Sequence, residues 1–167
     1  PAISAINSVR FLNAQVGLAA GVDGHVMRTT DGGETWTDSR PFPGKNLTRL
    51  TFVTQQTGFM LGSTGEFFKT TDAGITWGAL PLPANFAPVR ISFLNESIGL
   101  LTSTSSMIRT TDGGLTWTSI NIGVNVQGVC MVKPGLAFAG GPDTKVYISS
   151  DDGASWTLHH QPPGPSF

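Results

Sequence analysis

Short apolar runs separated by polar turns recur along the chain with a period of about 40 residues. Each period has three such runs, and we expect its tryptophan to begin a fourth. In the first period the runs are Ser8–Leu12, Gly17–Ala20 and Val26–Arg28, and the tryptophan is Trp36. Four strands of about five residues, joined by tight turns, account for a period of this length. The pattern therefore predicts one β unit that occurs four times.

Helices do not explain this pattern. Apolar residues do not recur at helical spacing over any window of about 11 residues, and glycine and proline are spread through every turn. The third run of a unit places two apolar residues in succession, as in Phe67 with Phe68. Both faces of the sheet should then be covered, as they are when blades pack face to face around an axis.

Each third run leads into the phrase Ser/Thr-x-Asp-x-Gly-x-Ser/Thr-Trp, which occurs four times. Its aspartates lie 41, 40 and 39 positions apart, and its tryptophans are the only four in the chain. This spacing predicts repeats at about 5–45, 46–86, 87–125 and 126–161 within a single domain of residues 1–167. The residues that define the phrase are Asp31 with Trp36, Asp72 with Trp77, Asp112 with Trp117, and Asp151 with Trp156.

Elementary chemistry gives the phrase a structural role. An aspartate in a hairpin turn accepts hydrogen bonds from the amides of the turn, a Thr or Ser hydroxyl adds a local partner, and the glycine permits a positive φ. The tryptophan then carries a large apolar surface into the layer between blades. A calcium loop would need several oxygen side chains at alternating positions, and these turns have one or two. We expect no metal and no cofactor.

These phrases resemble the Asp-box, or BNR repeat, of sialidase-type and related β-propellers. The longer form Arg/Lys-Thr-Thr-Asp-Gly-Gly-x-Thr-Trp is most similar to propellers related to the photosystem II stability and assembly factor. The resemblance implies an all-β propeller of four four-stranded antiparallel blades, or a four-blade segment of a larger ring, with one Asp-box per blade. An open segment would expose apolar blade faces and would form a homodimer or belong to a longer chain.

Composition limits the classes of partner that we expect. A formal net charge of −1, with 13% charged residues, gives no strong electrostatic attraction to nucleic acid, so we expect no nucleic-acid partner. The apolar runs are too short for membrane insertion. Cys130, the one cysteine, lies in an apolar run and is expected to be a buried thiol. The resemblance implies an extracytoplasmic setting, whether secreted, periplasmic or in an organellar lumen.

We label the four expected strands of a blade a to d in chain order, from the axis to the rim. Binding residues are expected on the loop face, which we define as the end of each blade that carries the b–c and d–a connections. The Asp-boxes are c–d turns and lie on the opposite face. Arg49 and Arg90 share one position just ahead of the innermost strand, where two guanidiniums would suit a carboxylate, a phosphate or an acidic side chain of a partner. Alternatively, each pairs with a nearby carboxylate or lies in solvent.

Phe42 and Phe86 lie in proline-rich connections of the same face. They could contact a partner, or fill the space beneath their own loops. The remaining loop-face candidates come from the b–c loops and are Asp23, His25, Glu66 and Asp143. A basic residue also recurs at one position of the third runs, at Arg28, Lys69 and Arg109. This recurrence suggests a structural role, such as covering an edge or pairing with the neighbouring blade.

Three functions remain open. A sialidase-like hydrolase would need a tyrosine nucleophile, but Tyr147 stands where other repeats have Met27, Phe68 and Ile108, which is a core position. No catalytic residue is therefore assigned, and the chain is not expected to be an enzyme. We expect a non-catalytic binding or assembly module that docks a protein partner. The alternatives are a lectin-like glycan-binding propeller and a sialidase-like glycoside hydrolase, for which two b–c carboxylates could act as acid and base.

Overall fold

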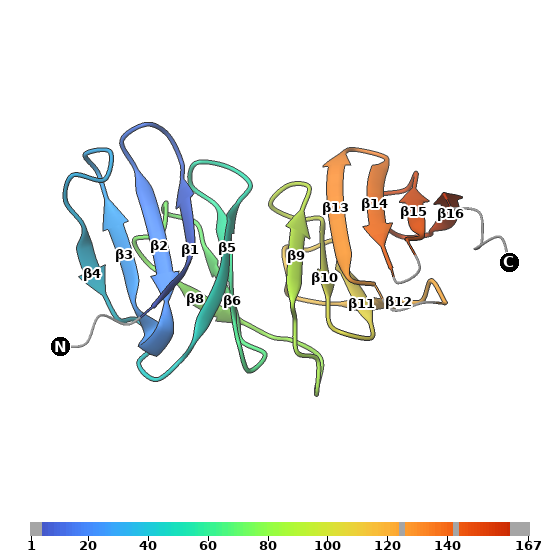
Figure 1. Cartoon of the computed structure of the whole chain (residues 1–167), viewed down its shortest axis with the longest axis horizontal. Coiled ribbons are helices and arrows are strands. Elements are labelled where there is room, and N and C mark those ends of the chain that lie inside the picture. The colour runs from blue at the N-terminus through green and yellow to red at the C-terminus, as the bar shows by residue number, and fades with distance from the viewer. Residues whose placement is uncertain (1–4, 124–125, 142–143, 161–167) are drawn as a thin grey trace, which may run out of the picture. The chain divides into compact units, whose positions relative to one another are not determined.

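The computed structural model describes residues 5–123, 126–141 and 144–160. Within them the strands form four four-stranded antiparallel sheets, each made of four consecutive strands (Figure 1). The fold class expected from the repeats, an all-β chain of four-stranded blades, is therefore confirmed. The contacts divide the chain into two compact units, Pro1–Ala87 and Pro88–Phe167, each containing two blades. The expectation of one domain over the whole chain stays a prediction.

Blades 1 and 2 make up the first unit. Blade 1 consists of β1 (Ile6–Phe11), β2 (Gly17–Gly21), β3 (Val26–Thr29) and β4 (Thr37–Ser39), with the 3₁₀ turn η1 (Val22–Gly24) between β2 and β3. Blade 2 consists of β5 (Leu47–Phe52), β6 (Gly58–Gly62), β7 (Phe67–Thr70) and β8 (Gly78–Leu80).

Blades 3 and 4 make up the second unit. Blade 3 consists of β9 (Arg90–Phe93), β10 (Gly99–Thr102), β11 (Met107–Thr110) and β12 (Thr118–Ile120). Blade 4 consists of β13 (Gly128–Lys133), β14 (Leu136–Gly140), β15 (Val146–Ser149) and β16 (Thr157–His160). In every blade the fourth strand begins one residue after the tryptophan. The expectation that the tryptophan itself begins this strand is wrong, because its residue still belongs to the Asp-box turn.

Glycine opens the second strand of the first three blades for a packing reason. The rings of Phe11, Phe52 and Phe93 lie across Gly17, Gly58 and Gly99, which are their register partners. A Cβ atom on any of these glycines would lie 2.5–2.9 Å from ring atoms of the phenylalanine. The first and second strands are therefore held together by a ring that covers bare backbone.

The core of the first unit lies between its two blades. Leu18, Ala20 and Val26 of blade 1 pack against Leu50, Met60 and Phe68 of blade 2, and all are at most 4% exposed. In β7 the successive residues Phe67 and Phe68 are both buried, as the sequence predicts for a sheet covered on both faces. Burial of these side chains is the main stabilising contribution to the unit.

The second unit repeats this arrangement with different residues. Leu100 and Met107 of blade 3 pack against Met131 and Ala137 of blade 4. Tyr147 is 8% exposed and joins a neighbouring apolar cluster, so the expectation of a core tyrosine is confirmed. Cys130, by contrast, is exposed rather than buried. Strand alternation sends its neighbour Met131 into the core and turns Cys130 to the other face.

Two of the three recurring basic residues of the third strands join adjacent blades, whereas Lys69 Nζ lies 5.3 Å from the ring centroid of Phe59 in its own blade. Within the first unit, Nε of Arg28 donates to the carbonyl oxygen of Ala73 in the Asp-box turn of blade 2, at 3.3 Å. Within the second unit, Nε of Arg109 donates to the carbonyl oxygen of Asp152 in blade 4, at 2.8 Å. Both acceptor residues have positive φ, 58° and 57°, which turns the carbonyl toward the preceding blade. We call this contact the arginine clip.

No helix in the described part of the chain has the length and apolar character needed to cross a membrane.

Candidate functional site

The Asp-box turns are closed by their own hydrogen bonds. In blade 2, Thr70 Oγ1 donates to Asp72 Oδ1 at 2.7 Å, while Thr76 donates to the same carboxylate through its hydroxyl and its backbone nitrogen. The amide of Gly74 in turn donates to Thr70 Oγ1 at 2.9 Å. The same bonds recur at Asp31, Asp112 and Asp151. The local turn network expected from the sequence is therefore present in all four blades.

These hydrogen bonds also set the charge of the boxes. They favour the carboxylate over the carboxylic acid, because an ionised carboxylate accepts hydrogen bonds and a protonated one must give up part of that capacity. Bonds from the Ser155 hydroxyl and amide lower the pKa of Asp151 to about 2, although slight burial opposes them. The pKa of Asp112 is lowered by the equivalent bonds from Thr116. The box aspartates are therefore ionised near neutral pH, and their carboxylate oxygens already accept hydrogen bonds from the turn.

Metal binding finds no support in these turns. Among the described residues, no group of three or more His, Cys, Asp or Glu side chains is placed to hold an ion.

On the loop face of the first unit, Asp23 ties two connections together. Asp23 has a φ of 58° in the b–c connection and forms an ion pair with Arg40 of the connection between β4 and β5. Its other carboxylate oxygen accepts the amide of Gly44 at 3.0 Å. The hydrogen bond from Gly44 and the guanidinium of Arg40 both lower the pKa of Asp23. The b–c and d–a connections therefore do share one face.

Glu66 and His25 are also paired on this face. Glu66 Oε1 lies 2.9 Å from Lys45 Nζ and accepts the Thr64 hydroxyl at 2.7 Å. Burial raises the pKa of Glu66, but the bonds from Thr64 and Lys45 outweigh it and bring the pKa to about 2. His25 Nδ1 lies 2.6 Å from Asp38 Oδ2. The structure thus gives each of these candidates a partner within its own unit. Asp143 lies outside the described residues.

The two phenylalanine candidates are half-buried. The ring of Phe42 stacks on Phe68, with centroids 3.8 Å apart and planes 23° apart, and joins the core of the first unit. Phe86 closes a turn in which its amide donates to the carbonyl of Pro83 at 3.1 Å. Phe42 therefore supports its own loop, which leaves a reduced ring surface for a partner.

Arg49 and Arg90 occupy equivalent register positions. Arg49 pairs with Leu61 in β6, and Arg90 pairs with Thr102 in β10, at matching places in the two ladders. Arg49 is exposed, whereas Arg90 is half-buried and donates from Nη1 to the carbonyl of Val89 at 3.2 Å. The shared position predicted from the sequence is confirmed. That the two side chains converge on one ligand stays a prediction.

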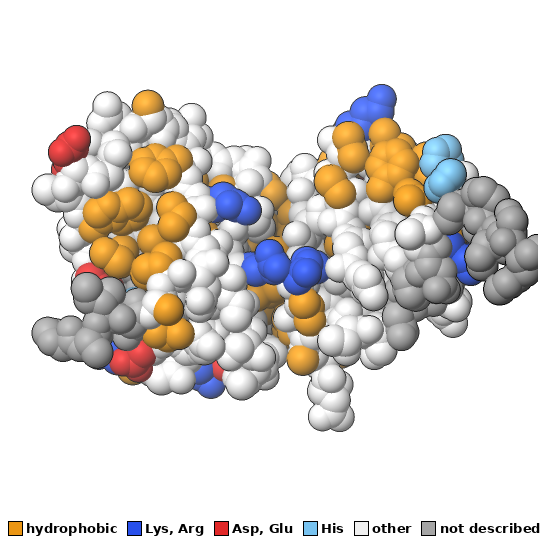
Figure 2. Space-filling view, in the orientation of Figure 1, with side chains coloured by type: hydrophobic (Ala, Val, Ile, Leu, Met, Phe, Trp, Pro, Cys, Tyr) orange, Lys and Arg blue, Asp and Glu red, His pale blue; other side chains and the backbone are white. Residues whose placement is uncertain are grey.

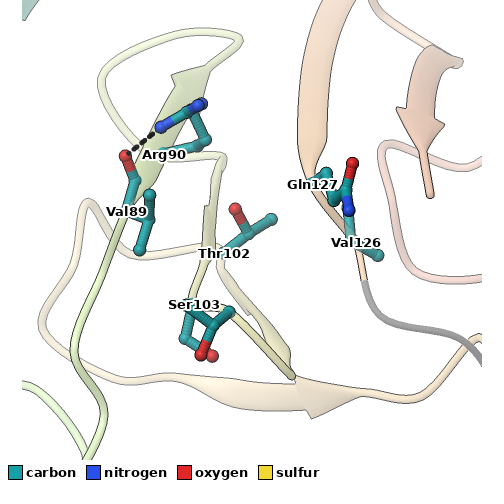
Figure 3. Close-up of a pocket in the computed structure, with 7 residues that line it drawn as sticks. Val89, Arg90, Thr102, Ser103, Val126 and Gln127 are labelled. Atoms are coloured by element: carbon teal, nitrogen blue, oxygen red, sulfur yellow. Dashed lines mark hydrogen bonds between the residues drawn. The ribbon is translucent and has the colours of Figure 1, made fainter. Parts of the chain in front are cut away.

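Arg90 lines a pocket of about 330 Å³ on the loop face of the second unit (Figure 3). The start of β9, the end of β10 with its following loop, and the residues just ahead of β13 supply its walls. Val89 and Val126 give it apolar surface, and Figure 3 shows the side chain of Thr102 between them. Among the described residues that line the pocket none is acidic, and Arg90 is the charged one. The lining residues are Val89, Arg90, Thr102, Ser103, Thr104, Val126 and Gln127.

Thr102 is the residue of this pocket that the sequence interpretation missed. It is 1% exposed, and no described residue is a hydrogen-bond partner of its Oγ1 atom. A buried hydroxyl without a partner loses about 1–3 kcal/mol relative to one that is paired, so a ligand that bonds to it gains affinity. A signal was available, because the equivalent positions in β2 and β6 are the apolar Ala20 and Leu61.

Comparison with known proteins places the chain in a family. Residues 2–118 match the sequence profile of the family described as photosynthesis system II assembly factor YCF48. The chain belongs to this family. The YCF48 profile covers blades 1 and 2 and most of blade 3, including the positions of Arg49, Arg90 and Thr102. A search of curated protein sequences finds no match.

Solved structures of YCF48 proteins share the fold. The structure titled YCF48 bound to D1 peptide superposes with a TM-score of 0.64 at 18% identity, covering 95% of this chain and 68% of the other. YCF48 from Cyanidioschyzon merolae gives a TM-score of 0.70 at 18% identity, covering 98% of this chain and 58% of the other. The chain thus spans between about half and two thirds of these relatives.

The same blades occur in proteins of another class. A GH74 enzyme from Niastella koreensis superposes with a TM-score of 0.71 at 18% identity, covering 93% of this chain but 29% of the enzyme. At such identities the likeness concerns the fold, and a propeller fold hosts many activities.

Proposed function

We propose that this chain is a non-catalytic assembly module that docks a protein partner on its loop face. The single observation that carries the proposal is the pocket around Arg90, which the half-buried Arg90 and two valines line together with Thr102, whose hydroxyl has no partner among the described residues. An exposed side chain of a partner could fill this space and satisfy both groups. Membership of the YCF48 family, one relative of which is described as bound to D1 peptide, supports a protein as the partner.

Docking would use residues that the repeat itself does not require. Arg49 and Arg90 serve as charged anchors, and the exposed parts of Phe42 and Phe86 add apolar contact. Arginine and aromatic residues are enriched where interfaces have most of their binding energy. Asp23 and Glu66 act indirectly in this proposal, because their ion pairs with Arg40 and Lys45 hold the loops that form the surface.

A catalytic role is less well supported. A glycosidase needs a carboxylic acid that stays protonated near its working pH, which requires a raised pKa. The bonds that lower the pKa of Asp23 and Glu66 leave both ionised instead. Tyr147, which would have to be the nucleophile of a sialidase-like enzyme, is buried in the core. A glycan-binding function would need stacking aromatic rings, and Phe42 is already stacked on Phe68.

Binding of a labelled D1 peptide tests the proposal. We expect saturable binding to the wild type, weakened about tenfold or more by Arg90→Ala, which removes a charge-assisted contact worth about 1.5–3 kcal/mol. Arg10→Ala is the matched control, since Arg10 also lies on an innermost strand and also donates to the carbonyl of the residue before it, at 2.9 Å. Equal losses for the two variants would contradict the proposal, as would turnover of a fluorogenic glycoside by the wild type.

A further inference from the structure

A second pocket lies between the two blades of the first unit, on a different side from the loop face. Its volume is about 400 Å³. The third and fourth strands of blade 1 form one wall, and the Asp-box turn of blade 2 forms the other. Four hydroxyl side chains, Thr30, Thr35, Thr37 and Ser39, face it together with Arg28 and Ile75.

Arg28 brings a positive charge to this pocket without forming an ion pair to a described residue. Its side chain is half-buried, and among the described residues its guanidinium forms one hydrogen bond, the arginine clip to Ala73. No carboxylate of the described residues lies within ion-pair distance of it. A partly buried guanidinium with free donors favours an oxyanion, which can accept two parallel hydrogen bonds from it.

The second unit has a clip at the same place with different neighbours. The equivalent Arg109 donates to the backbone carbonyl of Asp152, whose carboxylate oxygen Oδ1 accepts the amide of Gly135 at 2.7 Å. In the first unit the residue in that place is Ala73. Ser39 is likewise replaced by Ile120 at the equivalent place in β12. The first unit therefore has the more polar wall.

The hydroxyls specify which kind of oxyanion fits. The hydroxyls of Thr35 and Ser39 already donate to Asp31 Oδ2 at 2.5 Å and to the carbonyl of Val26 at 3.0 Å, so they offer only lone pairs to a ligand. Thr30 and Thr37 have no side-chain hydrogen bond to a described residue, so they can donate. A ligand that accepts from Arg28, Thr30 and Thr37 and also donates to Thr35 and Ser39 would bond to all five groups. Hydrogen phosphate, which keeps a P–OH group near neutral pH, does both, whereas sulfate has no donor.

We propose that this pocket binds a phosphate group together with a hydroxyl donor, which is the P–OH group of inorganic hydrogen phosphate or an alcohol group of a small hydroxylated phosphate monoester, since the monoester phosphate itself is mostly a dianion near neutral pH. Arg28 supplies the charge, Thr30 and Thr37 donate to phosphate oxygens, and Thr35 and Ser39 accept from the hydroxyl. Ile75, which is 67% exposed, offers apolar cover at the rim for the carbon atoms of an ester. This site is independent of the proposed docking surface.

The experiment is an NMR titration of the ¹⁵N-labelled full chain with inorganic phosphate, glycerol 3-phosphate and sulfate. We expect saturable shifts of the Thr37 and Ala73 amides with both phosphates, and at least tenfold weaker binding of sulfate. Tighter binding of glycerol 3-phosphate than of inorganic phosphate would identify a phosphate monoester as the ligand, and equal binding would identify inorganic phosphate as the ligand. Shifts with sulfate as strong as with phosphate, or no shifts at these amides, would overturn the proposal.

Three variants complete the test. Arg28→Gln should weaken phosphate binding at least tenfold, while Arg109→Gln, which removes the equivalent clip in the second unit, should leave it unchanged. Thr37→Val keeps the clip and the shape of the side chain, so it should fold normally and bind severalfold more weakly. Equal phosphate affinity in Arg28→Gln and Arg109→Gln would overturn the proposal, and so would full affinity in Thr37→Val.

Discussion

The side chain of Leu18 in blade 1 occupies the place that a Cβ atom on Gly74 of blade 2 would take. Leu100 and Gly153 stand in the same relationship in the second unit, where such a Cβ would lie 2.8 Å from a leucine methyl. The Asp-box glycine thus has two roles. It adopts a φ of 78° that closes the turn, and it leaves room for a leucine of the preceding blade.

Replacing Gly74 by alanine should therefore destabilise the chain by about 2–3 kcal/mol, because the methyl group both overpacks against Leu18 and strains a positive φ. Gly78→Ala is the matched control. Gly78 is exposed, and a Cβ atom there would meet nothing within 4 Å. Urea unfolding of the two variants measures the difference, and equal stabilities would show that the glycine is not an interface residue.

Replacement of tryptophan by phenylalanine should cost different amounts of stability at two of the Asp-boxes. Trp156 Nε1 donates to the carbonyl of Gly153 at 3.0 Å, whereas Trp77 Nε1 is buried without a partner among the described residues. Trp156→Phe loses a hydrogen bond and leaves a carbonyl unpaired, so it should cost about 1 kcal/mol more than Trp77→Phe. Unfolding by denaturant measures both costs. A larger loss for Trp77→Phe would contradict the hydrogen-bond assignment.

Acid should unfold the chain through its Asp-boxes. A carboxylate whose pKa is lower in the folded chain than in the unfolded chain stabilises the fold above the unfolded pKa, near 3.9, and that contribution is lost as the pH falls through the folded pKa. For Asp151 the folded pKa is about 2, so the loss should extend from roughly pH 4 down to pH 2.

Urea midpoints measured between pH 7 and pH 2 check this expectation. Asp151→Asn should be less stable at pH 7 and should show a flatter dependence on pH. Glu34→Gln is the control, because the exposed Glu34 side chain also lies in an Asp-box but forms no hydrogen bond to a described residue. An equally steep loss of stability in Asp151→Asn would assign acid unfolding to other groups.

Self-association is a further expectation, since apolar side chains gather on a face of blade 1. Val9 and Phe11 of β1 are 45% and 48% exposed, and Figure 2 shows apolar side chains on the viewed face of the first unit over β1 to β3. We expect light scattering of the wild type to detect a dimer, and Val9→Lys to shift it toward the monomer by placing a charge in the contact. A wild type that is strictly monomeric would show that this face is not an association surface.

The sequence predicted the structure well at positions that are alike in the four repeats, and less well where the repeats differ. The strands, their order and the Asp-box turns recur in register, so the four aligned copies gave the same prediction. The prediction of a buried Cys130 was wrong, because every residue of the run Val129–Val132 is apolar and such a run has no alternation to show which side faces the core. The exposed thiol is a consequence of register rather than of composition.

The candidate site was predicted less completely for a related reason. The position shared by Arg49 and Arg90 follows from alignment of the repeats. The ion pairs of Asp23 with Arg40 and of Glu66 with Lys45 join residues 17 and 21 positions apart, and they depend on how irregular loops return across the face. Thr102 could have been found as a hydroxyl at an apolar position, but its lack of a partner required the fold.

Position-specific photo-crosslinking tests the central claim, docking on the loop face, most directly. A benzoylphenylalanine is placed in the second unit at Thr104, an exposed residue of the Arg90 pocket, or at Leu115, which is 60% exposed in the Asp-box of blade 3. With a bound D1 peptide, we predict an adduct at position 104 that excess unlabelled peptide removes, and none at 115. An adduct at 115 without one at 104 would contradict the account.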